Sequence, residues 1–164
     1  MSNKCHKLLT FLTFIISGLL ISFSVMASPA QGFFSEDNIK ALKNDPLVLF
    51  SKSNACHLKS ILGKKDYPLF KESMSLETSE EAAADDVVIS GGVRGLFTIY
   101  EGFFRMSSTG NVWIAYLYDN KVHYFTNDEA SLKQPPKIMV DWYGRFKEAK
   151  WITKQVTVNP KACK

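Results

Sequence analysis

The sequence offers three candidate general acids or bases, Glu101, His123 and Asp141. Glu101 interrupts the apolar run 97–104, and His123 lies within the β-type run Lys-Val-His-Tyr-Phe. Because residues two or four apart on a strand share a face, an ion pair with Arg105 or across strands is the simpler interpretation of Glu101. For His123 we expect a cross-strand contact. A small hydrolase using Glu101 and His123 stays open, although no partner carboxylate or nucleophile stands at a recognisable spacing.

Cysteines and histidines are few after residue 27: Cys56 and Cys163, His57 and His123. Adjacent residues on a helix face different ways, and no further Cys or His stands at metal-ligand spacing from Cys56 and His57. We therefore expect neither a metal nor a cofactor. A cysteine pair in an oxidising compartment usually forms a disulfide, here closing 163 − 56 = 107 residue steps. Two free, buried thiols are the alternative.

The stretch Gly-Gly-Val-Arg-Gly-Leu at 91–96 joins two predicted strands. Glycine permits positive φ and a close approach of the backbone to another group. Arg94, at the centre, suits two-pronged pairing with a carboxylate. We therefore predict a protruding loop that enters an acidic cleft of another protein; an ordinary connection with a solvated arginine is the alternative. The predicted partner-binding residues are Gly92, Val93, Arg94, Gly95 and Leu96.

Residues 1–27 have the parts of a cleavable export signal: Lys4 and Lys7, an apolar stretch over 8–25, and the tripeptide Val-Met-Ala at 25–27, with small or modest residues at the −3 and −1 positions. We expect cleavage after Ala27, with the bond after Ala30 as second choice and an uncleaved membrane anchor as the alternative. Cleavage leaves 164 − 27 = 137 residues with 20 − 2 = 18 basic against 16 acidic side chains. This near-neutral balance argues against nucleic-acid binding. The mature chain is expected in the periplasm or secreted, without membrane attachment.

Local signals divide the mature chain into a flexible leader, 28–34, and a single domain, 35–164. Ser35 and Ser53 are predicted helix caps, Gly63 a helix stop and 68–74 a third helix, which together form a helical section over 35–75. The acidic segment 75–86 reads as a solvated connector. Sheet and helix follow over 86–158, with predicted strands at 87–90, 96–106, 112–118, 121–126 and 151–158 and a helix over 135–147.

Both faces of the predicted sheet are apolar. Alternation places Val112, Ile114 and Tyr116 on one face, and Trp113 and Ala115 on the other. We expect one face to pack on helices, which leaves the other available to a partner or to a second copy in a homodimer. The predicted fold is α+β, an antiparallel β-meander of four to five strands with helices packed on one face and an N-terminal helical section.

A known family shares the order of motifs between Ile89 and Phe146. A strand leads into a glycine-containing loop, then come Ser-Thr-Gly-Asn-Val-Trp-Ile-Ala, Asp-Asn-Lys-Val-His-Tyr-Phe, and a Pro-Pro entry to a helix that carries Trp142. This run, under half the chain, resembles the inhibitor of vertebrate lysozyme family. In that family a Cys-Lys-Pro-His-Asp-Cys type loop carries the histidine that enters the lysozyme active site. The equivalent stretch here, 92–97, lacks both cysteines and the histidine.

The resemblance implies a non-enzymatic periplasmic protein that binds a lysozyme or a cell-wall hydrolase. Arg94 then takes the place of the family's histidine and pairs with catalytic carboxylates. An immunity protein against a periplasm-directed toxin is the alternative binding role.

Overall fold

The computed structural model describes residues 32–80, 86–146, 148–159 and 163. The predicted export signal and both candidate cleavage sites lie outside the described residues. The helices are α1 (Glu36–Asn44), η1 (Pro46–Phe50), α2 (Lys52–Ser73), α3 (Glu129–Lys133) and α4 (Lys137–Tyr143). The strands are β1 (Leu76–Glu80), β2 (Asp86–Gly92), β3 (Glu101–Ser107), β4 (Val112–Tyr118), β5 (Lys121–Thr126) and β6 (Lys150–Gln155).

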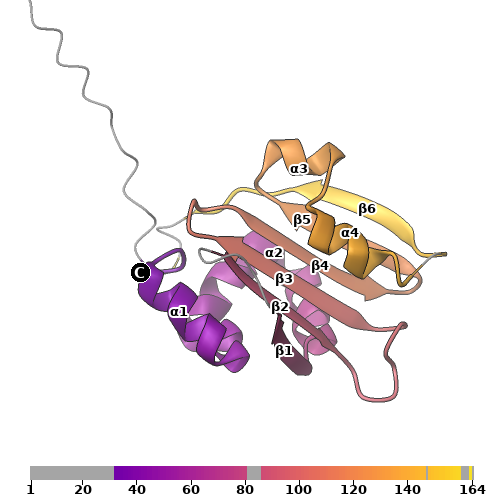
Figure 1. Cartoon of the computed structure of the whole chain (residues 1–164), viewed down its shortest axis with the longest axis horizontal. Coiled ribbons are helices and arrows are strands. Elements are labelled where there is room, and N and C mark those ends of the chain that lie inside the picture. Colours follow the sequence, from indigo (N-terminus) through magenta and orange to yellow (C-terminus); the bar gives the residue numbers. More distant parts are fainter. Residues whose placement is uncertain (1–31, 81–85, 147, 160–162, 164) are drawn as a thin grey trace, which may run out of the picture.

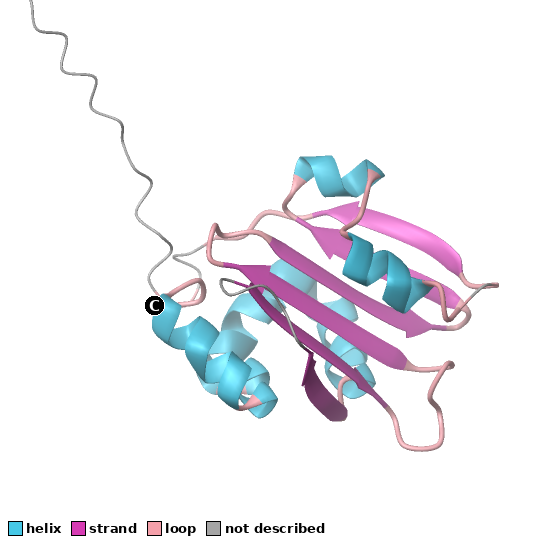
Figure 2. Cartoon of the chain, in the orientation of Figure 1, coloured by secondary structure: helices cyan, strands magenta, loops and turns pink. Residues whose placement is uncertain are grey.

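One six-stranded sheet organises the domain, with the strands in sequence order from β1 to β6. Strands β1 to β5 form an antiparallel meander, and β6 returns parallel to β5 at the edge. Asp119 and Asn120 have φ values of 52° and 53°, as a tight type I′ hairpin between β4 and β5 requires. The predicted α+β class, meander and N-terminal helical section are confirmed (Figure 1, Figure 2).

Side-chain caps set the starts of the first helices. The Ser35 hydroxyl accepts the Asn38 N–H at 3.2 Å and caps α1 as predicted. Ser51, rather than the predicted Ser53, caps α2 by accepting the Asn54 N–H at 3.4 Å. Gly63 breaks α2 into two helical segments because its φ of 76° lies outside the helical region. The predicted third helix at 68–74 is the end of this second segment, which stops at Ser73 with Met74 as its C-cap.

Helices cover both faces of the sheet. On the α2 face, α1, η1 and α2 pack on Ile89, Phe104, Ile114, Tyr116 and Phe125. On the α4 face, α4 and the turn after it pack on Val88, Phe103, Trp113, Leu117 and Tyr124. Figure 1 shows α2 behind the sheet and α4 in front of it. The prediction of helices on one face alone is therefore corrected, since the second apolar face is covered by α4 of the same chain.

Two segments assigned as unstructured belong to the fold. Leu76–Glu80, expected in a solvated connector, is β1 and pairs with β2 from Leu76↔Gly92 to Glu80↔Val88. Phe33 and Phe34, expected in a flexible leader, are buried in the core of the α2 face. The Asn38 side-chain amide donates to the Phe33 carbonyl at 2.7 Å and fixes this start of the domain. No helix among the described residues has the length and apolar composition to cross a membrane.

Candidate functional site

The loop between β2 and β3, residues 93–100, projects from one end of the sheet (Figure 1). Its backbone is closed by internal hydrogen bonds. The Val93 N–H donates to the Tyr100 carbonyl at 3.2 Å, and the Leu96 carbonyl accepts from Tyr100 N–H at 2.8 Å and from Ile99 N–H at 3.0 Å. The loop therefore has a backbone shape of its own, and at its end the Tyr100 hydroxyl joins it to α2 by donating to the Leu69 carbonyl at 3.0 Å.

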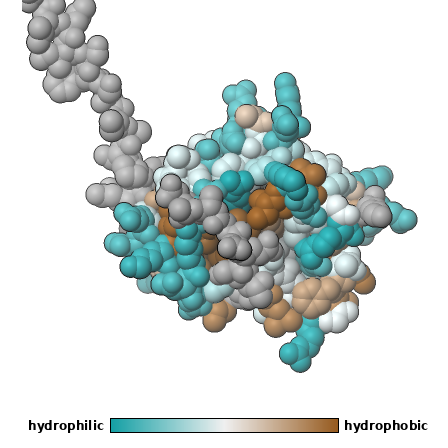
Figure 3. Space-filling view, viewed as in Figure 1, coloured by the Kyte–Doolittle hydropathy of each residue, from teal (hydrophilic) through white to brown (hydrophobic). Residues whose placement is uncertain are grey.

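Large apolar side chains on this loop face solvent. Ile99 is 63% and Phe97 51% exposed, and Leu96 is exposed beside them. The base of the loop adds exposed Leu76, which pairs with Gly92, and Tyr118, whose ring lies 5.5 Å from that of Tyr100. We name these five exposed side chains the loop patch: Leu76, Leu96, Phe97, Ile99 and Tyr118. Figure 3 shows brown surface at the lower edge of the molecule, on the side where Figure 1 places the loop.

The predicted partner-binding residues divide between strand and loop. Gly92 is buried as the last residue of β2, whereas Val93 to Leu96 lie in the loop, with Arg94 and Gly95 exposed. Gly95 has a φ of 77°, which glycine adopts without strain. Within the described part of the chain, Arg94 joins no ion pair. A charged arginine in the midst of apolar side chains is thus presented to solvent.

Glu101, at the start of β3, lies buried under this loop. Its Oε1 accepts the Thr98 N–H at 2.8 Å, and its Oε2 forms an ion pair with Arg145 Nη2 at 2.6 Å. Arg105 is not its partner, because that guanidinium donates to Asp86 Oδ2 at 3.0 Å. The expected Glu101–Arg105 pair is wrong, since Arg105 lies opposite Val88 and reaches diagonally to Asp86, two residues along the neighbouring strand. No local pattern identifies Arg145, which lies after α4.

A second polar cluster lies on the opposite side of the sheet. Asp66 of α2 accepts the Tyr116 hydroxyl at 2.6 Å and the Lys154 ammonium at 2.8 Å. Burial raises the pKa of Asp66, but the hydrogen bonds from Lys154 and Tyr116 outweigh burial and hold that pKa below its usual value. The pKa of Tyr116 is raised by burial and by its bond to Asp66. His123 stacks on the Tyr116 ring at 4.7 Å, a cross-strand contact as predicted.

The three candidate acids and bases do not converge. Glu101 lies on the same face as Phe103, which belongs to the α4 face, whereas His123 pairs with Tyr116 on the α2 face. Asp141 is exposed on α4 and pairs with Lys137 one turn earlier. Burial, followed by the charge of Lys154, lowers the pKa of His123, and its Nδ1 has no hydrogen-bond partner. The described residues do not bring these three groups to a common point.

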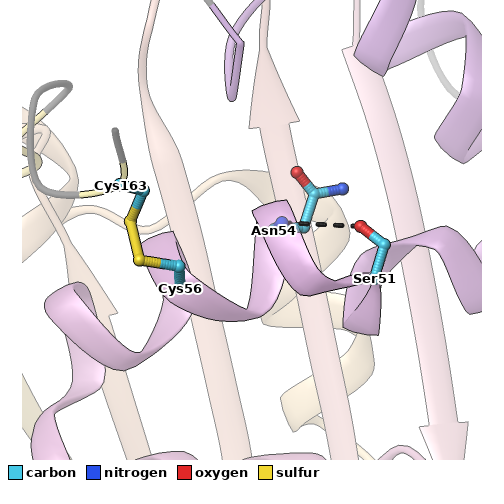
Figure 4. The surroundings of a disulfide bond; sticks show 4 residues. All are labelled: Ser51, Asn54, Cys56 and Cys163. Atoms are coloured by element: carbon cyan, nitrogen blue, oxygen red, sulfur yellow. Dashed lines mark hydrogen bonds between the residues drawn. A yellow bond between two sulfur atoms is a disulfide. The ribbon is translucent and has the colours of Figure 1, made fainter.

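A disulfide joins Cys56 on α2 to Cys163, with the two Cα atoms 5.7 Å apart (Figure 4). The predicted bridge is confirmed, and it ties the C-terminal tail to the helical layer. The next residue, His57, stacks on the Phe33 ring at 4.9 Å and is buried. No group of three Cys, His, Asp or Glu side chains suited to a metal ion occurs in the part of the chain that the structure describes.

Comparison with known proteins yields no relative. No family model matches the sequence, and no curated protein and no solved structure matches the chain. The resemblance to the lysozyme-inhibitor family therefore stays a prediction, and the functional argument rests on the geometry of the loop.

Proposed function

We propose that this chain is an exported, non-enzymatic domain that binds another protein by inserting the β2–β3 loop into an acidic cleft. The observation that carries the proposal is the exposed Arg94 among the exposed side chains of the loop patch. Apolar groups of this size are normally buried, and where they cluster on a surface they mark interaction sites. Arginine and aromatic side chains are the groups that most often dominate binding energy at protein interfaces.

The chemistry of the loop defines what it fits. Arg94 supplies a guanidinium fork that matches a carboxylate, and Phe97 and Ile99 supply the apolar contact around it. The complementary surface is therefore a cleft with apolar walls and one or more acidic side chains. A lysozyme or related cell-wall hydrolase has this character, because two carboxylates flank the bond that such enzymes cleave.

The compartment in which we expect this protein is one in which such a partner occurs. Disulfides such as that between Cys56 and Cys163 form and persist in oxidising compartments, which include the bacterial periplasm and the extracellular space. Cell-wall hydrolases act in the same compartments. The periplasm is thus part of the proposal, together with export by the segment 1–27.

The proposal is tested by adding the mature chain to lysozymes of the c, g and i types and measuring muramidase activity. We expect inhibition by the unsubstituted chain, and for Arg94→Ala an inhibition constant at least tenfold higher, as for a central interface arginine. Lys133→Ala is the matched control, because it removes an exposed cation from α3, at the end of the molecule away from the loop (Figure 1). This control should inhibit like the unsubstituted chain.

Absence of inhibition at micromolar concentration for all three types would exclude lysozyme as the partner. The wider proposal is then tested by affinity capture from periplasmic extract with the unsubstituted chain and with Arg94→Ala. Equal recovery by both chains would contradict binding through the loop, whereas a toxin recovered by the unsubstituted chain alone would indicate an immunity protein. Light scattering tests the homodimer: self-association abolished by Ile99→Ser would mean that the loop patch binds a second copy.

A further inference from the structure

The β2–β3 loop contains a backbone conformation that its residue type disfavours. Thr98 has a φ of 70°, in the left-handed region, which β-branched residues rarely occupy. Such a conformation persists only where the surroundings hold it, and it occurs preferentially at ligand-binding sites. Thr98 is itself exposed, so packing of its side chain does not hold it. Its backbone N–H is the group that is held, by Glu101 Oε1 at 2.8 Å.

Glu101 is in turn held by Arg145, in the turn after α4. Its side chain is only 3% exposed, and its second oxygen lies 2.6 Å from Arg145 Nη2. Arg145 is fixed by a hydrogen bond from its Nε to the Trp142 carbonyl at 3.3 Å and by the Phe146 ring, 5.4 Å from its guanidinium carbon. Trp142 and Phe146 belong to the core of the α4 face. A continuous set of contacts therefore runs from that core through Arg145 and Glu101 to the backbone of the loop.

From these contacts we infer that Glu101 and Arg145 are positioning residues that hold the β2–β3 loop in its binding shape before a partner arrives. This inference rests on the proposed function, because it assigns what prepares the same loop for docking. A loop that is already ordered binds without the entropic cost of ordering it. Glu101 thus acts on the partner through Thr98 and need not touch the partner itself.

Limited trypsin digestion tests the inference without any partner. The peptide bond after Arg94 is the cleavage site of interest, since both Arg94 and Gly95 are exposed. The bond after Lys133, also between exposed residues, is the internal reference. In Glu101→Ala the Thr98 N–H loses its acceptor, so we expect cleavage after Arg94 to accelerate at least tenfold relative to cleavage after Lys133. In Arg145→Ala the Thr98 bond remains, so we expect a smaller increase.

Glu101→Gln distinguishes positioning from a general structural role. Its amide oxygen can still accept the Thr98 N–H, so the relative rate of cleavage after Arg94 should return to within about threefold of the unsubstituted chain. Asp86→Ala is the matched control. It removes another acid with an arginine partner, Arg105, from the far end of the same pair of strands. This control should leave the relative rate unchanged.

Three results would overturn the inference. One is an unchanged rate after Arg94 in Glu101→Ala. Another is equal acceleration at both bonds, which would indicate general destabilisation. The last is a Glu101→Gln chain cleaved as fast as Glu101→Ala, because the hydrogen-bond acceptor would then be irrelevant. None of these measurements contains a lysozyme, so failure of the lysozyme assay and failure of this inference are separate outcomes.

Discussion

Asp66 on the α2 face and Glu101 on the α4 face are both buried carboxylates with one oxygen on a cation. They differ in what the other oxygen accepts. For Asp66 it is the hydroxyl of Tyr116, a fully buried side chain. For Glu101 it is the backbone N–H of Thr98, in an exposed loop. The same side-chain chemistry thus stabilises the core on one face and shapes a surface on the other.

The cationic partners of the two carboxylates explain less of this difference in role than their uncharged hydrogen-bond donors do. Lys154 and Arg145 have side chains 41% and 49% exposed, so water screens both ion pairs and each can be hydrated when its acid is removed. The buried hydroxyl of Tyr116 has no such alternative, whereas Thr98 belongs to an exposed loop that can turn its amide toward water once Glu101 is removed. Removal of Asp66 should therefore lower the stability of the fold, and removal of Glu101 should chiefly alter the loop.

The largest effect is expected for Asp66→Ala. The variant leaves the Tyr116 hydroxyl without an acceptor in the core, which costs about 2–3 kcal/mol in the free energy of unfolding. Glu101→Ala should cost only about 1 kcal/mol, because solvent replaces the lost acceptor at Thr98. Urea denaturation of both variants measures the difference. Equal losses would show that the two carboxylates have the same structural role.

Gly92 and Gly102, on the adjacent strands β2 and β3, extend the comparison between the loop and the core. A Cβ on Gly102 would lie 2.5 Å from the Met74 Sδ and 2.5 Å from the Ser73 Oγ, two buried side chains at the C-terminal end of α2. A Cβ on Gly92 would lie 2.6 Å from the ring of Phe97, which is exposed and can swing outward. Overpacking should make Gly102→Ala less stable by about 2 kcal/mol, and Gly92→Ala by less than about 1 kcal/mol.

Thermal and urea unfolding measure the cost of the two alanine variants, and digestion after Arg94 reports on the loop. Gly92→Ala should accelerate this cleavage because it displaces Phe97, while Gly102→Ala should change it no more than it changes cleavage after Lys133. A Gly92→Ala chain as destabilised as Gly102→Ala would mean that the loop is part of the core.

A smaller change in the free energy of unfolding is expected from pH, through titratable groups on the α2 face. Burial lowers the pKa of both His57 and His123 below the ordinary value of 6.5. The unfolded chain then binds more protons than the folded chain below pH 6.5, so the free energy of unfolding falls as the pH drops through that value. The depressed pKa of Asp66 acts with the same sign only at more acidic pH, below 3.8.

Urea midpoints between about pH 7.5 and pH 5 measure this dependence. The control is the double variant His57→Gln, His123→Gln, which should flatten the curve. The relative cleavage after Arg94 should not follow the pH, because neither histidine lies in the loop or on the α4 face. A wild-type slope that persists in the double variant would assign the dependence to other groups.

Local patterns predicted much of this molecule. The Ser35 cap with acids in the first turn of α1, the hairpin at Asp119 and Asn120, and the alternation along β4 all depend on neighbours in the chain. The disulfide followed from the count of cysteines and the expected compartment. The loop around Arg94 followed from glycine spacing, and the structure shows that it is exposed.

Other features depend on segments far apart in the chain. β1 forms because its backbone completes the hydrogen bonds of β2. The acidic, polar sequence of this segment does not by itself predict a strand. Phe33 and Phe34 are buried because α1 and α2 leave space for them beside Phe104, whose ring lies 6.5 Å from that of Phe33. α4 covers the second face because the sheet is apolar on both sides.

The sequence by itself indicated most of the periodic elements, the cysteine pair of the disulfide and an arginine between glycines, because each follows from residues close together or from composition. Only the tertiary structure decided which cation pairs with Glu101 and which donors bond to Asp66, since those partners come from segments remote in the chain. A buried carboxylate must be paired wherever it lies. The sequence around such a carboxylate indicates that it requires a partner but does not identify the partner.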